Sequence, residues 1–212
     1  MKRLYTTLFA LLSLTGAAQA SEIAPTSMDV RPVPAGLQAP DVTLQTESGR
    51  PVQLKSLINK PTVLVFYRGG WCPYCNTQLA GLREIEPKLT TLGYQILAVT
   101  PDSPDAIAQS RKDTKGGALP YTLLSDSQFV AAKAFGIAYY LDAKTSDAYL
   151  NQYKLNLNKE ERTGKVVLPV PAVYLVGADG LLQYSFVHIN YKVRLQNELL
   201  LHAARLALEK TE

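Results

Sequence analysis

The two cysteines of this chain, Cys72 and Cys75, have the C-x-x-C spacing and follow directly after an apolar run at residues 62–67. A segment with helical spacing of its apolar residues comes next, at 76–92. A dithiol at a strand-to-helix turn is the arrangement that thiol–disulfide exchange uses. A bridge that closes only four residues restricts the unfolded chain little. The spacing therefore favours redox exchange over a structural staple.

Cys72 is predicted to be the reactive thiol of the pair. Only a thiolate attacks a disulfide or a peroxide, so a redox cysteine needs a lowered pKa. The N-terminus of the following helix favours negative charge, and Pro73 suits the first helical position. Arg68 lies close enough in sequence to add positive charge. We expect Cys72 to be the exposed attacking thiolate and Cys75, one turn inside the helix, to be the resolving thiol.

Two other uses of a cysteine pair were weighed against redox chemistry. A zinc site needs two further ligands, and the chain offers only His188 and His202, which are distant and not in a ligand-type spacing. We therefore expect no metal and no cofactor beyond the Cys72–Cys75 redox pair. An inert pair that forms a structural disulfide in a non-catalytic module remains an alternative.

The pattern around the dithiol predicts alternating strands and helices. Alternating apolar residues on both sides of a Ser-Gly turn predict an N-terminal β-hairpin. Expected strands lie at residues 41–46, 51–54, 62–67, 95–100, 121–124, 172–176 and 181–189. Expected helices lie at residues 76–92, 104–113, 126–135, 142–153 and 193–209, with a break at 116–117 and a polar loop at 154–164. This order predicts an α/β fold in which helices flank a central mixed sheet.

The first twenty residues carry the features of a secretory signal peptide. Lys2 and Arg3 precede a mostly apolar stretch at 4–14, and residues 18–20 form a small-x-small cleavage signature. An uncleaved anchor is the alternative, but the apolar stretch is short for a ~30 Å hydrocarbon layer. We expect cleavage after Ala20 and a periplasmic or secreted protein. Residues 21–39, rich in proline, are predicted to form an extended leader to a domain at 40–212.

Cleavage would leave 192 residues (212 − 20), enough for one domain with a sizeable core. Loss of Lys2 and Arg3 would lower the formal net charge from +4 to +2. Such a weak charge without a basic cluster argues against a nucleic-acid partner. No later stretch has a transmembrane length, so we do not expect an integral membrane protein.

The sequence resembles the thioredoxin superfamily. Trp-Cys-Pro-Tyr-Cys at residues 71–75, after an apolar strand, is similar to the superfamily's active site: the Trp-Cys start is similar to thioredoxin and the Cys-Pro-Tyr-Cys loop to glutaredoxin. Beyond that loop the chain resembles the peroxiredoxin-like (AhpC/TSA, redoxin) branch. Its opening hairpin is matched by residues 39–44 and 49–54, and its late strand and turn by 171–180.

The resemblance implies a thioredoxin-like fold and further site residues. In such folds a cis-proline begins the strand that faces the dithiol, and Pro171 matches that position, with Pro169 as an alternative. A cis Val170–Pro171 bond would expose backbone groups of Val170 that dock an extended substrate beside the cysteines. Arg68, Trp71, Pro73 and Tyr74 would then be the supporting residues around the pair.

Two departures from the peroxiredoxin pattern bear on the reaction. Peroxiredoxins place a threonine three residues before the peroxidatic cysteine and an arginine near the start of the late strand. Here Cys72 occupies the threonine position, if Cys75 is the aligned cysteine, and Pro171 the arginine position. We therefore expect a redoxin that acts as a thiol–disulfide oxidoreductase on thiol or disulfide proteins or small thiols. The alternative is an antioxidant, thiol-dependent peroxidase that reduces hydroperoxides through a sulfenate, in which Cys75 is peroxidatic.

Overall fold

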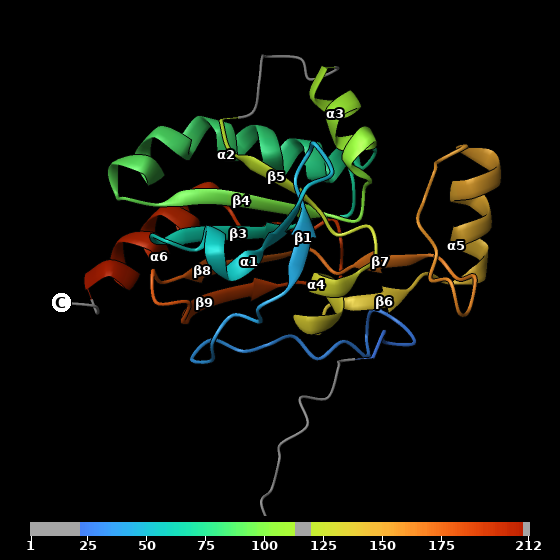
Figure 1. Cartoon of the computed structure of the whole chain (residues 1–212), viewed down its shortest axis with the longest axis horizontal. Coiled ribbons are helices and arrows are strands. Elements are labelled where there is room, and N and C mark those ends of the chain that lie inside the picture. Colours follow the sequence, from blue (N-terminus) through green and yellow to red (C-terminus); the bar gives the residue numbers. More distant parts are fainter. Residues whose placement is uncertain (1–21, 113–119, 210–212) are drawn as a thin grey trace, which may run out of the picture.

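The computed structural model describes residues 22–112 and 120–209, and one central sheet organises them (Figure 1). The expected signal peptide and the break at residues 116–117 lie outside the described residues. Its elements are β1 (Thr43–Gln45), β2 (Pro51–Gln53), α1 (Leu54–Leu57), β3 (Thr62–Phe66), α2 (Pro73–Thr91), β4 (Gln95–Thr100), α3 (Pro104–Lys112), β5 (Thr122–Ser125), α4 (Val130–Ala134), β6 (Ala138–Tyr140), α5 (Ala143–Asp147), a π-helical turn η1 (Ala148–Gln152), β7 (Val167–Pro169), β8 (Ala172–Val176), β9 (Leu182–Val187) and α6 (Asn197–Glu209).

The sheet has seven strands in the order β2-β1-β5-β4-β3-β8-β9. β3 pairs in parallel with β4 and antiparallel with β8, so the sheet is mixed. β1 and β2 form the expected hairpin, with Leu44 opposite Val52. The predicted α/β fold with a central mixed sheet and an N-terminal hairpin is therefore confirmed.

Helices and loops bury both faces of the sheet. All five residues of β3 are buried, because alternate side chains pack on opposite faces and both faces are covered. Val63 and Val65 pack on the face covered by α2 and α6, whereas Leu64 and Phe66 pack on the face covered by α4 and the β6–β7 ribbon. The carboxyl end of β3 is thus held rigidly at the centre of the molecule, where α2 begins.

The segment between α4 and β8 contains structure that the sequence pattern did not predict. β6 and β7 form a separate two-stranded antiparallel sheet. The expected helix at 142–153 is present as α5 and η1, and Asp142 caps it by accepting a hydrogen bond from Thr145 N at 2.9 Å. Figure 1 shows this helix standing at one side of the body, beside β6 and β7.

The leader at residues 22–39 runs along the domain. Ala24 N donates to Ala138 O at 2.9 Å, and Ile23 and Val30 are buried in the core. The closing helix was expected from residue 193 but starts at Asn197. The four residues before it are irregular, because the Arg194 guanidinium donates hydrogen bonds to the backbone carbonyls of Tyr191 and Val193.

Candidate active site

The β3–α2 loop places Cys72 at the N-cap of α2. Cys72 has an extended backbone, and its carbonyl accepts hydrogen bonds from the backbone N–H groups of Cys75 and Asn76, each at 3.0 Å. Pro73 occupies the first turn of the helix, where a missing N–H costs nothing. The sulfur of Cys72 therefore lies at the positive end of the helix dipole.

Two residues fix the shape of this loop. Gly69 has a φ of +144°, and a Cβ at that position would come within 2.2 Å of Trp71 Nε1, so only glycine lets the loop fold against the indole. Asp102, just after β4, accepts a hydrogen bond from Gly70 N at 2.7 Å. Burial raises the pKa of Asp102, while the bonds from Gly70 and Thr100 oppose that rise.

Both sulfurs are buried and both cysteines are present as thiols. The expectation that Cys72 is exposed is therefore wrong: only 1% of its surface is accessible. The Cys72 side chain, at the N-cap of α2, packs into the same apolar cluster as Leu79 and Tyr67. A substrate must reach Cys72 through a movement of the surrounding side chains.

The two thiols have opposite pKa shifts. The pKa of Cys72 is lowered to about 6, mainly because the Cys75 thiol donates a hydrogen bond to it; burial opposes the shift, and Arg68 and Arg194 add positive charge. The same hydrogen bond raises the pKa of Cys75, and burial raises it further. Of the two thiols, Cys72 is therefore the more acidic.

Arg68 lies buried in an aromatic cage beside the thiols. Its guanidinium carbon is 4.1 Å from the ring centre of Tyr191, 5.2 Å from Trp71 and 5.7 Å from Tyr149. Among the described residues its Nε and Nη1 atoms find no hydrogen-bond partner. Tyr149 comes from η1 and also packs edge-on against Trp71 at 5.3 Å, so the segment between α4 and β8 supplies one wall of the site.

A second arginine contacts the other sulfur. Arg194 Nη2 donates to Cys75 Sγ at 3.4 Å and comes from the irregular stretch before α6. The sequence pattern gave no role to this segment, because 119 residues separate the two partners along the chain. Tyr149 and Asp102 were missed for the same reason: each is brought to the dithiol by the fold, and no local spacing marks it.

Val170 and Pro171, the expected docking residues, lie directly before β8. Within residues 22–112 and 120–209 no peptide bond is cis, so the prediction of a cis Val170–Pro171 bond is wrong. The backbone N–H of Val170 donates to Ile137 O at 2.8 Å, and its side chain is fully buried. Because the segment after α4 occupies this N–H, it is not available to an extended substrate.

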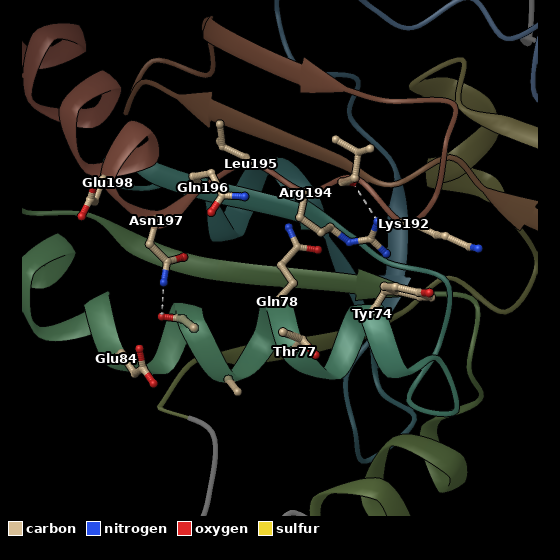
Figure 2. Close-up of a pocket in the computed structure, with 13 residues that line it drawn as sticks. Tyr74, Thr77, Gln78, Glu84, Lys192, Arg194, Leu195, Gln196, Asn197 and Glu198 are labelled. Carbon is tan, nitrogen blue, oxygen red and sulfur yellow. Dashed lines mark hydrogen bonds between the residues drawn. The ribbon is translucent and has the colours of Figure 1, made fainter.

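An open groove runs along α2, between this helix and the stretch that leads into α6 (Figure 2). Its volume is about 1210 Å³, and one wall is α2 while the other is the stretch that leads into α6. Tyr74, which is 41% exposed, and Arg194 lie at its cysteine end. Asn197 Nδ2 donates to Gly81 O at 3.0 Å and ties the two walls together. The groove is therefore a preformed approach to the residues that surround Cys75.

The described residues hold no cluster of three or more His, Cys, Asp or Glu side chains that could bind a metal ion. None of the helices in the same parts of the chain combines the length and the apolar character that a membrane span requires.

The AhpC/TSA family model matches residues 35–185. A Bcp-type peroxiredoxin of Haemophilus influenzae is 34% identical over 108 residues, which are 51% of this chain and 68% of that protein. A chloroplastic peroxiredoxin Q of Sedum lineare is 32% identical over 102 residues, or 48% of this chain and 53% of the relative. The matched segment thus spans about half to two thirds of these relatives.

Solved peroxiredoxin structures have the same fold. The peroxidoxin BcpB of Mycobacterium tuberculosis superposes with a TM-score of 0.62 at 18% identity, over 82% of this chain and 97% of the other. Reduced Prx3 of Vibrio vulnificus, solved with hydrogen peroxide, gives a TM-score of 0.64 at 16% identity, over 81% and 99%. At such identities the likeness establishes the fold alone.

Proposed function

Because this chain belongs to the AhpC/TSA family, we propose that it is an oxidoreductase that exchanges thiols and disulfides through Cys72 and Cys75. One observation carries the proposal: the two thiols adjoin each other at the N-terminus of α2, where Cys72 is the N-cap and Arg194 contacts Cys75. A hydrogen bond from Cys75 lowers the pKa of Cys72 to about 6, below the ordinary value near ~8.5, so the reactive thiolate is favoured at neutral pH.

The proposed reaction has two steps. The Cys72 thiolate attacks one sulfur of a substrate disulfide, forms a mixed disulfide, and releases the other substrate sulfur as a thiolate. The hydrogen bond to Cys72 is the largest cause of the raised Cys75 pKa. Once Cys72 loses its charge this bond is weakened, so Cys75 can pass its proton to the departing thiolate. Cys75, now a thiolate, then attacks the Cys72 sulfur, which closes the protein disulfide and releases the second substrate sulfur as a thiolate that takes its proton from water. Two electrons pass from the dithiol to the substrate, and the reverse sequence oxidises a substrate dithiol.

Hydroperoxide reduction is the second candidate. Arg194, which donates to Cys75 Sγ at 3.4 Å, supports it together with the peroxiredoxin names of the relatives. In this reaction Cys75, as a thiolate, attacks the O–O bond, becomes a sulfenic acid and releases an alcohol or water. Cys72 then condenses with the sulfenic acid to give the disulfide and water, and an external thiol restores the dithiol.

The remaining proposals concern setting and partners. We propose that the protein is exported after cleavage behind Ala20 and works in the periplasm or outside the cell. Its partners would be thiol or disulfide proteins or small thiols, and hydroperoxides in the second candidate. The redox group is the Cys72–Cys75 pair itself, so no further cofactor is needed.

The chain's one tryptophan, Trp71, adjoins Cys72, so its fluorescence can follow oxidation of the pair. We would mix the reduced protein with a model disulfide or with hydrogen peroxide by stopped flow. The proposal expects fast reaction with the disulfide and reaction with peroxide no faster than that of a free thiol. The opposite ranking would establish the peroxidase. A pair that resists millimolar dithiothreitol would reject both and leave a structural bridge.

Serine variants would separate the roles of the sulfurs. Cys75→Ser should still attack a disulfide but stop at the mixed disulfide, whereas Cys72→Ser should not react. If Cys72→Ser keeps fast peroxide reactivity while Cys75→Ser loses it, Cys75 is the attacking sulfur and our assignment is wrong.

A further inference from the structure

The groove along α2 carries opposite charges at its two ends. Lys192 and Arg194 lie at the cysteine end, where Lys192 Nζ is 6.0 Å from the ring centre of Tyr74. Glu84 and Glu198 line the other end. Figure 2 shows Glu84 and Glu198 at one end of the groove and Lys192 beside Tyr74 at the other. The groove therefore has a direction.

The distal carboxylates are free to bind a ligand. Glu84 and Glu198 are both exposed, and within residues 22–112 and 120–209 neither forms an ion pair. They come from different elements, α2 and α6, which the Asn197–Gly81 hydrogen bond holds together. A Cβ on Gly81 would approach Asn197 Nδ2 to 2.8 Å, so this glycine permits the close approach. Two uncompensated negative charges thus face one space.

The cysteine end has unused hydrogen-bonding capacity as well as charge. Gln78 Oε1 and Arg194 Nε are buried in the groove walls and lack partners among the described residues. One is an acceptor and the other a donor, and both lie beneath the groove surface, so a bound peptide backbone would reach them only after the two side chains turn outward. Arg194 also contacts Cys75, so one side chain of the groove wall touches the dithiol.

We propose that the groove binds an extended polypeptide segment of the partner that exchanges its disulfide with Cys72. The segment carries an acidic residue next to its reactive cysteine and a basic residue farther along. Tyr74 and Glu84 are ten residues apart on α2, which is about 15 Å at a rise of ~1.5 Å per residue. An extended chain covers this distance in about four to five residues at ~3.3 Å each. The proposal rests on the proposed function and names the kind of substrate on which it acts.

Synthetic peptides would test the charge pattern. Each contains one cysteine linked to a thionitrobenzoate leaving group, with aspartate beside the cysteine and lysine four or five residues away, in both chain directions. Two further peptides have the charges exchanged or removed. Attack by Cys72 of the Cys75→Ser variant forms the protein–peptide disulfide and releases the coloured thiolate, so its absorbance gives the rate.

Charge-reversal variants at the distal end supply the matched test. Glu84→Lys with Glu198→Lys should slow the aspartate–lysine peptide by about three- to tenfold, the range that one or two exposed ion pairs supply, and should speed the charge-exchanged peptide. Glu86→Lys, a change of the same charge on the same helix outside the groove, should leave the preference unchanged. Reaction with a small neutral disulfide should be the same in all variants. Higher salt should reduce the preference.

Direct binding separates this inference from the proposed function. Peptides with serine in place of cysteine would be titrated against the Cys72→Ser, Cys75→Ser protein by fluorescence anisotropy. Tighter binding of the aspartate–lysine peptide, abolished by the Glu84 and Glu198 reversals, would support peptide binding in the groove. If that peptide binds but no disulfide reacts, only the proposed exchange chemistry is rejected. Equal binding and equal rates for all three charge patterns would overturn the inference, even if disulfide exchange is fast.

Discussion

Replacing Cys75 by alanine should raise the pKa of Cys72, and replacing it by serine should not. The largest cause of the low Cys72 pKa, about 6, is the hydrogen bond that the Cys75 thiol donates. Alanine removes this donor, whereas a serine hydroxyl of similar size keeps one. Both variants keep the Arg194 charge, which also lowers the Cys72 pKa, so its attraction for the thiolate is common to the two. The difference between them therefore isolates the hydrogen bond.

The size of the shift follows from the strength of a hydrogen bond to a charged group. Such a bond is worth about 1.5–3 kcal/mol, and one pKa unit corresponds to about 1.4 kcal/mol. Cys75→Ala should therefore shift the Cys72 midpoint by about one to two units, to about 7–8, while Cys75→Ser stays nearer 6. The shift is upward because the lost bond favours the thiolate.

The assay is the pH dependence of alkylation by iodoacetamide, with the midpoint as its readout. The rate at pH 7 alone is a poor measure, because a higher pKa lowers the thiolate fraction but raises the nucleophilicity of each thiolate, with a Brønsted slope of about 0.4–0.5. For a shift of about 1.5 units these two effects nearly cancel. Cys72→Ser identifies the thiol that titrates.

Two outcomes would refute this reasoning. If both Cys75 variants titrate near 6, the arginines and the helix N-terminus suffice to ionise Cys72. If both shift upward equally, the cause lies in something that alanine and serine both remove, such as the position of Arg194.

Three further results are expected. The folded-state pKa of Cys72 is lowered to about 6, whereas the unfolded value is near ~8.5. The free energy of unfolding of the reduced protein should therefore rise by about 1.4 kcal/mol per pH unit between these two values. Denaturant titrations at several pH values should show a smaller rise with pH in Cys72→Ala. Gly69→Ala should cost about 1–3 kcal/mol and change the fluorescence of Trp71, because its Cβ would strike the indole. Asp102→Ala should cost about 1–3 kcal/mol by leaving Gly70 N unpaired, and Asp102→Asn, which keeps an acceptor, should cost less in the same titrations.

The parts of the fold that the sequence predicted well are those set by local pattern. The apolar run at residues 62–67 can be buried only as a central strand, and Pro73 marks the start of α2 without reference to any distant residue. The hairpin of β1 and β2 is likewise encoded by alternation around a turn. The order of these elements was enough to establish the fold class and to place Cys72 at a helix N-terminus.

Contacts between distant segments could not be predicted in this way. The leader has the prolines of an extended segment, but burial of Ile23 and Val30 depends on a surface made by α4 and β6. Cys72 was expected to be exposed because helix N-termini usually are, and its burial depends on segments that pack around it from elsewhere. The same limit explains the error at Pro171, since the Val170 N–H was already used by Ile137, a partner thirty-three residues away in sequence.

The arginine that peroxiredoxin chemistry needs is missing from the aligned position at Pro171, yet the fold brings Arg194 to Cys75 from a different segment. This replacement does not restore the same chemistry. A peroxidase in which Cys75 attacks needs Cys75 ionised, but the hydrogen bond between the thiols lowers the pKa of Cys72 and raises that of Cys75. Arg194 can stabilise a Cys75 thiolate only after the Cys72 charge has been consumed in a bond to a substrate. Under the proposed exchange reaction, the same arginine would assist the resolving step, in which Cys75 attacks Cys72.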